Sequence, residues 1–359
     1  MPQQSEIAHP EVSIVVPARN EEANLGDCLR SLAGQAGVVF EIIVVDDGST
    51  DRTGEIAESF AGVRVMAAPP LPRGWTGKNN AVVAGAAAAR GEWLLFTDAD
   101  TVHLPGSLAR ALAEAKRERA DLLSYSPEQV VGTFAERAVM PVVFAELAVE
   151  YPPAKVQDPG SGIVAANGQY VLARRVAYES IGGHAALAGE ILEDVALAKA
   201  FRRAGLRVYF RYGGDAVRAR MYRSWAQLRD GWTKNLALLF PHPGRRAVQS
   251  LLWWAAAWLA LALALYSAAG RMFYGVGLAV LWLLVYRRTR KAHFGVANNL
   301  TAVACGLPLF AFLLLQSKKG HRSGSVAWKG RIYARGEVPD RGLASRATSM
   351  DDRTLTTEN

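Results

Sequence analysis

Short apolar runs alternate with segments of helical spacing in roughly the first hundred residues. Between the apolar runs, hydrophobic residues recur every three or four positions, as on the buried face of a helix. This strict alternation predicts an α/β fold with a mostly parallel sheet and flanking helices. The predicted strands are Ser13–Pro17, Glu41–Val45, Val63–Met66 and Trp93–Phe96. The first two have the apolar character of strands buried on both faces. The predicted helices are Leu25–Leu32, Thr53–Phe60 and Asn79–Arg90.

The pattern continues less regularly to residue 211. Phe134–Tyr151 is apolar but contains three glutamates and is interrupted by Pro141. We therefore expect a helix that lies on a membrane surface or on its neighbours, and not one that crosses a bilayer. The segments beyond it predict loop and strand over 158–175, a helix over Glu193–Ala204 and a strand over Arg207–Arg211.

Three long uncharged runs follow. Ala247–Gly270 has 24 residues, enough to cross a bilayer at about 1.5 Å per residue. Met272–Tyr286 is shorter and suits the return leg of a hairpin. Phe294–Ser317 contains two asparagines and the segment Gly306–Pro308, where we expect the helix to break. The chain thus divides into a tail (1–11), an α/β domain (12–235), a membrane domain (247–317) and a tail (318–359) that is disordered after about residue 335.

Basic clusters orient this predicted membrane domain. They are Arg287, Arg288, Arg290 and Lys291 after the second run, and Lys318, Lys319 and Arg322 after the third. The positive-inside rule puts both clusters, and the α/β domain, in the cytoplasm. The third run is then expected to be re-entrant; the alternative is a span with the tail outside, against the rule. Since no basic segment followed by an apolar core opens the chain, we expect no cleaved signal peptide. The apolar runs and basic clusters together predict a multi-pass protein of the plasma membrane.

Composition narrows the class of protein. The 41 basic and 33 acidic residues give a net charge of +8, which suits nucleic acid, an anionic membrane or phosphorylated substrates. Because many basic residues flank apolar runs and no basic–aromatic RNA-binding module is present, we expect a membrane and no nucleic acid as partner. The two cysteines, Cys28 and Cys305, indicate neither a disulfide framework nor a zinc site.

Acidic residues follow two of the predicted strands. Asp46 and Asp47 end the second strand, and Asp98 and Asp100 end the fourth. The carboxyl ends of parallel strands meet at one edge, where α/β folds bind ligands. Two carboxylates there could hold Mg²⁺ or Mn²⁺ together with substrate phosphates. The alternative is that these aspartates only cap turns, as aspartates often do.

Two common phosphate-binding motifs are absent from the sequence. No GxGxxG follows the first strand, and Gly77-Lys78 lacks both the first glycine and the Ser/Thr of a P-loop. Dehydrogenase and P-loop NTPase functions are therefore disfavoured.

Further candidates lie later in the chain. Glu193 and Asp194 open a predicted helix, where acids are favoured in any case, but Asp194 would also suit a general base. Three further candidates precede the membrane segments and could form an interface belt: Arg220, Arg229 and Trp232. Alternatively these three, together with Glu193, could bind a diphosphate or the acceptor.

Five motifs in order carry a resemblance to a known family. VSIVVPARNEEANL, EIIVVDDGSTDRT, GKNNA, GEWLLFTDAD and EDVALA resemble family 2 glycosyltransferases with the GT-A fold, a Rossmann-like, mostly parallel sheet. The resemblance covers about Val12 to Asn235. The segments GQYVLARR, MYRSWAQLRDGWTKN and WKGRIY are similar to the branch associated with hopanoids and carotenoid glycosylation.

The resemblance implies roles for individual residues. Pro17, Glu21, Asp46, Asp47 and Lys78 would lie at the nucleotide-sugar, a UDP-sugar being favoured. Asp98 and Asp100 would hold the metal and diphosphate, and Asp194 looks like the family's base. The implied reaction is transfer of a single sugar to a lipid hydroxyl with inversion.

One departure from the family and three rival interpretations remain at this point. The QxxRW motif of processive members is only a remnant at Gln227–Trp232, which favours single transfer. The rivals are transfer to polyprenyl phosphate, a catalytically degenerate membrane scaffold and, least favoured, a nucleic-acid binder.

Overall fold

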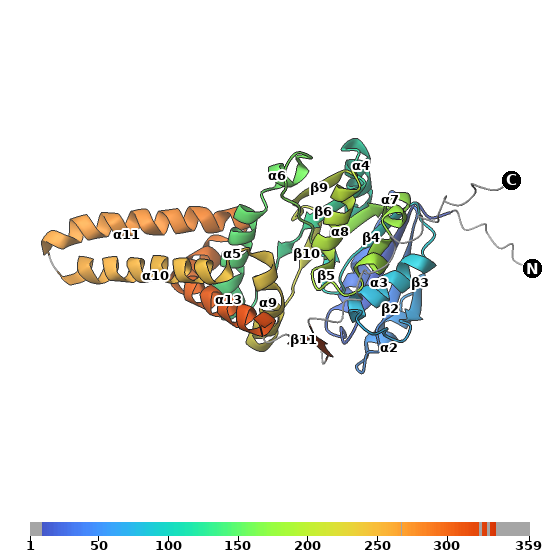
Figure 1. Ribbon diagram of the computed structural model, residues 1–359, viewed down its shortest axis with the longest axis horizontal. Helices are drawn as coiled ribbons and strands as arrows, with labels where there is room; N and C mark the ends of the chain where they lie inside the picture. Colours follow the sequence, from blue (N-terminus) through green and yellow to red (C-terminus); the bar gives the residue numbers. More distant parts are fainter. Residues whose placement is uncertain (1–8, 267, 323–324, 329–330, 335–359) are drawn as a thin grey trace, which may run out of the picture.

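The computed structural model describes residues 9–266, 268–322, 325–328 and 331–334. The molecule has an α/β body that contains the sheets, and a pair of long helices projects from the other end of the molecule (Figure 1). The disorder expected after residue 335, and most of the expected tail over 1–11, lie outside the described residues.

The main sheet has seven strands and is mostly parallel, as expected. β1 pairs in parallel with β2 and β4, β2 with β3, and β6 with β9. β8 runs antiparallel to both β4 and β6 and joins the two parallel halves. The strands in spatial order are β3 (Val63–Ala67), β2 (Phe40–Asp46), β1 (Val12–Ala18), β4 (Trp93–Phe96), β8 (Val171–Arg174), β6 (Leu122–Ser126) and β9 (Val208–Tyr212).

A small second sheet begins directly after the Asp98–Asp100 turn. In it β10 lies between β5, to which it is antiparallel, and β7, to which it is parallel. These strands are too short to show a pattern in the sequence, and they were not predicted. They are β5 (Thr101–His103), β7 (Glu128–Gln129) and β10 (Val217–Ala219).

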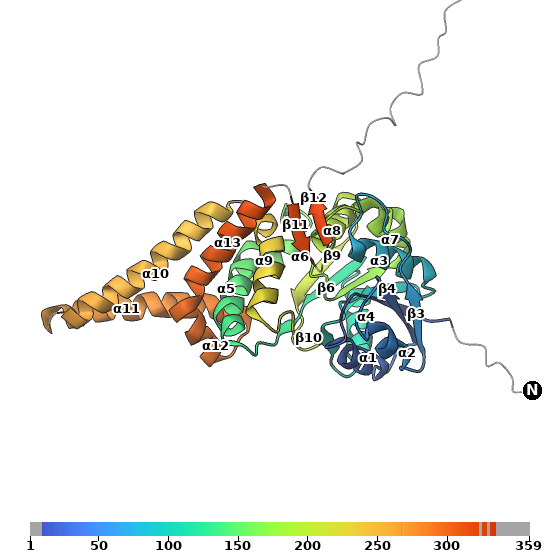
Figure 2. The same cartoon turned by 90° about the horizontal axis from the view of Figure 1, so that it is seen from below.

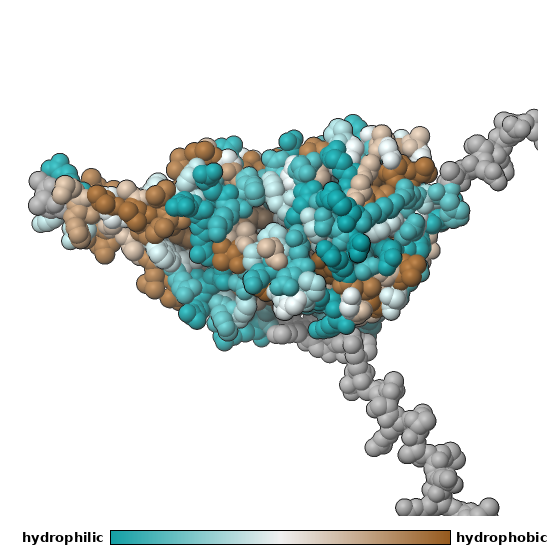
Figure 3. Space-filling model, turned by 90° about the horizontal axis from the view of Figure 1, so that it is seen from above, coloured by the Kyte–Doolittle hydropathy of each residue, from teal (hydrophilic) through white to brown (hydrophobic). Residues whose placement is uncertain are grey.

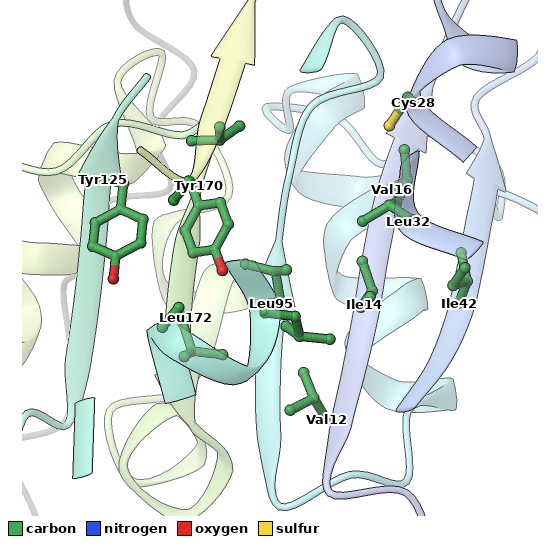
Figure 4. Close-up of a cluster of buried hydrophobic side chains, with 14 of the residues drawn as sticks. Val12, Ile14, Val16, Cys28, Leu32, Ile42, Leu95, Tyr125, Tyr170 and Leu172 are labelled. Atoms are coloured by element: carbon green, nitrogen blue, oxygen red, sulfur yellow. The ribbon is translucent and has the colours of Figure 1, made fainter. Parts of the chain in front are cut away.

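Helices cover both faces of the main sheet and bury its central strands, whereas the edge strands β3 and β9 are only partly buried. Even-numbered residues of β1, such as Ile14, pack under α1 and α4 in one core, which Figure 4 shows. Odd-numbered residues, such as Val15, pack under α3 and α8 in a second core. Gly85 of α3 permits this approach, because a Cβ there would overlap Val15 and come within 3.0 Å of Val45. The helices around the sheet are α1 (Leu25–Ala33), α2 (Thr53–Glu58), α3 (Gly77–Ala88), α4 (Ser107–Arg117), α6 (Pro153–Gln157), α7 (Arg175–Ser180) and α8 (Glu193–Arg203).

A third core joins the catalytic body to the C-terminal helices. It contains buried residues of α5 (Phe134–Glu150), α9 (Trp225–Leu239) and α13 (Leu307–Arg322). α5 begins at a capping box made by Thr133 and Glu136 and continues through Pro141. Of the two positions expected for this helix, the structure has the one against neighbouring helices.

The third apolar run does not break where we expected. α12 (Val296–Thr301) continues through a π-helical turn (Ala302–Gly306) into α13, so the segment is helical from Val296 to Arg322. The π-turn widens the backbone just before Pro308, whose ring would otherwise clash with the preceding turn. The expected break at Gly306–Pro308 is therefore wrong.

The first two apolar runs form α10 (Pro243–Tyr266) and α11 (Ala268–Thr289), which lie side by side. Figure 3 shows hydrophobic side chains gathered on this projecting pair. By length and composition, Pro243–Tyr266 and Val296–Arg322 are each able to cross a membrane. β11 (Ser325–Trp328) and β12 (Arg331–Ala334) form a small hairpin beside α9 and α13 (Figure 2).

Candidate active site

Side chains from distant parts of the chain meet at the carboxyl edge of the main sheet. They surround a small cavity of about 10 Å³, room for at most one water. Pro17 comes from β1, Asp98 follows β4, Lys78 begins α3, and Glu193 and Asp194 begin α8. Residues that lie far apart in the chain are thus neighbours, as parallel strands with crossover helices require.

Lys78 links two of these acids. Its Nζ lies 2.7 Å from Asp98 Oδ1 and 2.7 Å from Glu193 Oε1. Thr76 caps α3 by accepting a hydrogen bond from Asn79 N, which holds Lys78 in the first helical turn. Burial alone would lower the pKa of Lys78, but the two carboxylates raise it well above its usual range. Lys78 is therefore a fixed positive charge in the pocket.

Asp194 is held by two backbone groups. Its Oδ2 accepts a hydrogen bond from Gly168 N at 2.7 Å, and its Oδ1 accepts one from Val195 N at 2.8 Å. Burial, and then the charge of Glu193, raise the pKa of Asp194 to about 6, although Lys78 and the two N–H groups oppose this. Asp194 is consequently mostly ionised at pH 7, yet is a stronger base than an exposed aspartate.

Glu193, the neighbour of Asp194, has the opposite environment. Burial would raise the pKa of Glu193, but Lys78 and then Lys234 of α9 lower it below its usual value. The adjacent carboxylates thus have pKa values that are pushed apart, a feature common at acid–base sites.

Asp98 and Asp100 are on the turn after β4, with the buried Ala99 between them. Asp100 Oδ1 accepts a hydrogen bond from Gln169 Nε2 at 3.3 Å. Within the described residues, no three His, Cys, Asp or Glu side chains gather as a metal site. Mg²⁺ and Mn²⁺ at nucleotide sites need only one or two carboxylates, with phosphates completing the shell, so these two residues fit such a cation.

The candidate residues from the first part of the chain lie close to the ends of β1 and β2. Asp47 is buried, and its carbonyl accepts a hydrogen bond from Arg19 Nη1 at 2.6 Å. Glu21 N donates to Thr53 Oγ1 at 2.7 Å. Asp46 Oδ1 accepts from Ser49 N and Oγ at 2.9 and 2.6 Å. Asp46 therefore has the geometry of the turn-capping alternative.

The three later candidates lie apart from Asp194. Arg229 pairs with Asp230 on the exposed face of α9. Trp232 is buried in the third core, with Nε1 3.3 Å from Met140 Sδ. Arg220 Nη2 lies 3.7 Å from Glu136 Oε2, and the backbone N of Arg220 donates to the Asp100 carbonyl at 3.2 Å. None of the three lines the cavity.

Three residues in or beside this pocket were not predicted as site residues. Gly168 holds Asp194, and a Cβ there would come within 3.1 Å of Lys78 Nζ. His184 lines the cavity with its ring against Phe96, and burial lowers the pKa of His184 to about 4, so it is neutral at pH 7. The charge of Lys234 acts on Glu193 and Asp194. Of these, only the Gly168-Gln169 segment had a signal in the sequence, through its similarity to one branch of the family.

Comparisons with known proteins agree with this geometry. The family described as Glycosyl transferase family 2 matches residues 13–181. The 4,4'-diaponeurosporenoate glycosyltransferase of Staphylococcus aureus (strain MRSA252) is 31% identical over 340 residues, which cover 91% of this chain and 89% of the relative. This chain belongs to glycosyl transferase family 2.

A second relative and a solved structure support the same family and its fold. The S. aureus (strain USA300) protein of the same name is 29% identical over 339 residues, with 91% of this chain and 89% of the relative covered. The structure of the mannosyltransferase PcManGT from Pyrobaculum calidifontis, in complex with GDP-Man and Mn2+, has a TM-score of 0.52 at 18% identity. It covers 88% of this chain and 87% of that one. At this identity the likeness shows the GT-A fold alone, which confirms the predicted fold class. This family 2 chain is therefore an enzyme of glycosyl transfer.

Proposed function

We propose that this family 2 chain is a membrane-bound, inverting glycosyltransferase. It moves one sugar from a nucleotide-diphosphate donor, with UDP-sugars as the first to test, to a hydroxyl of a carotenoid- or hopanoid-like lipid. The observation that carries this proposal is Asp194, a carboxylate with a pKa of about 6 fixed by two backbone N–H groups in the cavity that Asp98 also lines.

Asp194 acts as the general base. It takes the proton of the acceptor hydroxyl as that oxygen attacks the anomeric carbon. The bond from this carbon to the diphosphate oxygen breaks, and the electron pair leaves with the diphosphate. A single displacement of this kind inverts the configuration. The raised pKa suits the role, because a base is most effective when its pKa is close to the working pH.

The donor's diphosphate is bound on the other side of the pocket. Asp98 and Asp100 would hold a divalent cation, Mg²⁺ or Mn²⁺, which neutralises the diphosphate as it leaves. Lys78 adds a fixed positive charge between Asp98 and Glu193. Pro17 lines the cavity, and Glu21 and Asp47, which do not, would bind the nucleotide beside it, with Asp46 shaping the adjoining turn.

The C-terminal helices would deliver an apolar acceptor. α10 and the helix over Val296–Arg322 are long and apolar enough to cross a membrane. The basic cluster around Arg287 favours a cytoplasmic catalytic domain in the plasma membrane. The third core ties these helices to α5 and α9, so the pocket would remain close to the bilayer surface.

A second candidate is transfer to an acceptor that is already ionised. The suffix of 4,4'-diaponeurosporenoate, in the name of the S. aureus relative, denotes a carboxylate. A carboxylate, or the phosphate of a polyprenyl phosphate, attacks without losing a proton. Such a reaction would not need Asp194 as a base.

The first test is transfer by the full chain in detergent. The purified protein is incubated with radiolabelled nucleotide sugars, a lipid extract and Mn²⁺, with EDTA as the metal-free arm, and label is measured in the organic phase. We expect label in lipid only with the metal, and we expect Asp194→Asn to lower the rate by about 10²- to 10⁴-fold with little change in donor binding. Asp27→Asn, an exposed acid on α1, is the matched control.

Each outcome of this test separates the candidates. Near wild-type transfer by Asp194→Asn would refute the base and favour an ionised acceptor. Label that stays entirely in the aqueous phase for wild type would refute the lipid acceptor.

A further inference from the structure

A second pocket lies where α10 begins and shares no lining residue with the candidate active site. It is open and has a volume of about 420 Å³. We call it the α10 pocket. Its lining residues are Pro241, His242, Pro243, Gly244, Arg245 and Lys318.

The basic side chains of the α10 pocket come from two separate parts of the chain. His242 and Arg245 are at the start of α10, and Lys318 is near the end of α13. Lys318 reaches across to α10: its Nζ would be only 2.7 Å from a Cβ at Gly244. The glycine therefore leaves the space in which the ammonium group lies against the first turn of α10.

Within the part of the chain that the structure describes, the basic side chains of the α10 pocket form no ion pair. The nearby carboxylates are used by other residues: Glu146 pairs with Arg246 at 2.5 Å and Arg288 at 2.6 Å, and Glu150 pairs with Arg246 at 2.6 Å. Among the described residues, neither Arg245, Lys318 nor His242 forms an ion pair. The α10 pocket thus has excess positive charge, which an anion would neutralise.

The position of the pocket indicates the source of the anion. Figure 2 shows the start of α10 and the end of α13 on the same side of the molecule. From this point α10 runs outward as part of the projecting helix pair, on which Figure 3 shows hydrophobic side chains. Leu252 and Leu259 of α10 are exposed. If α10 enters a bilayer, its first turn lies at the level of the head groups.

We propose that the α10 pocket binds the phosphate of an anionic lipid head group. Lysine and arginine donors make charge-assisted hydrogen bonds to phosphate oxygens, and cytoplasmic leaflets are rich in anionic lipids. The inference rests on the membrane association put forward under the proposed function. Bound lipid would fix α10 and α13 relative to each other and so hold the third core at the membrane surface.

The test is direct binding of dioctanoyl phosphatidylglycerol to the full chain in neutral detergent, measured by native mass spectrometry. Two variants alter the pocket: Arg245→Gln/Lys318→Gln removes two charges, and Gly244→Ala displaces the Lys318 ammonium without changing net charge. We expect the double variant to bind the lipid at least about tenfold more weakly, and Gly244→Ala to bind it several-fold more weakly. The matched control is Arg290→Gln/Lys319→Gln, which removes two exposed charges from the same end of the molecule outside the pocket.

Two results would overturn the proposal. Equal weakening in the pocket and control double variants would mean general attraction to surface charge. Competition by inorganic phosphate as strong as that by the lipid would mean a site for free phosphate. Because the assay contains no sugar donor and needs no turnover, its outcome is independent of whether the chain transfers sugar to lipid.

Discussion

At the scale of single residues, the decisive feature is a pair of adjacent carboxylates with different environments. Glu193 pairs with Lys78, whereas Asp194 accepts hydrogen bonds only from backbone N–H groups among the contacts described. The charge of Glu193 therefore helps to raise the pKa of Asp194, and that of Lys78 lowers it. The proposed base is tuned by two residues that need not touch the acceptor.

This tuning predicts the pH dependence of transfer. The base must be ionised, so we expect the rate to be full well above pH 6, to be half-maximal near a pH of about 6 and to fall further at lower pH. Glu193→Gln removes a negative charge beside Asp194, so we expect the acid limb to shift to lower pH by roughly one unit. Lys78→Met should shift it to higher pH. The measurement is the single-turnover rate against pH.

The control for these pH profiles is Glu58→Gln, a substitution of an exposed residue on α2, which should leave the profile of rate against pH unchanged. Shifts of the same sign in Glu193→Gln and Lys78→Met would contradict the assignment of Asp194 as the titrating base.

At the scale of elements, the packing of α5 against the π-helical turn connects the catalytic body to the C-terminal helices. Gly306 ends that turn, and a Cβ there would overlap the backbone carbonyl oxygen of Ala138 on α5. A backbone atom cannot move aside as the end of a flexible side chain can. The absence of a side chain at Gly306 is thus what allows the two elements to approach so closely.

We expect Gly306→Ala to lower the stability of the full chain in detergent by about 1–3 kcal/mol, because it overpacks this contact. The measurement is thermal unfolding followed by circular dichroism. Gly277→Ala in α11, where a Cβ would meet nothing within 4 Å, is the control and should be neutral or slightly stabilising. Equal stability of the two variants would mean that α5 and the π-turn do not pack as described.

At the scale of the whole molecule, the polar α/β body contrasts with the apolar pair α10 and α11. Leu252 and Leu259 of α10 are 64% and 61% exposed and, seven residues apart, lie on the same face of the helix. So much exposed apolar surface on a projecting element indicates a membrane or another apolar partner.

Leu252→Asp/Leu259→Asp tests which of these covers α10. Each aspartate near the centre of a spanning helix costs about 2.5–3.5 kcal/mol of insertion free energy, so we expect the variant to be extracted from membranes by alkaline carbonate. Wild type and Leu252→Ala/Leu259→Ala should stay in the pellet. Retention of the aspartate variant would indicate that this face of α10 lies against protein, not lipid.

The sequence alone determined the features that depend on local pattern. Runs such as Ile14–Val16 and Ile42–Val45 are apolar on both faces because both faces are covered, and Asp47 and Asp98 follow such strands directly. The α/β fold with its mostly parallel sheet follows from the alternation of strand and helix, whereas its GT-A type was implied by the resemblance to family 2. The same alternation led us to expect these acids at one edge of the sheet. The membrane topology and the roles of the site residues remain predictions.

Only the tertiary structure decided how the distant parts meet. Val171–Arg174 is too short to reveal that it runs antiparallel between two parallel halves, and that insertion brings Gly168 to Asp194. The same holds for α9, whose sequence left open whether Arg229 and Trp232 form an interface belt or bind the diphosphate or acceptor. In the structure Arg229 faces solvent and Trp232 packs against α5. Spacing along the chain cannot show which face of a helix meets the pocket, because that depends on contacts between residues far apart in the sequence.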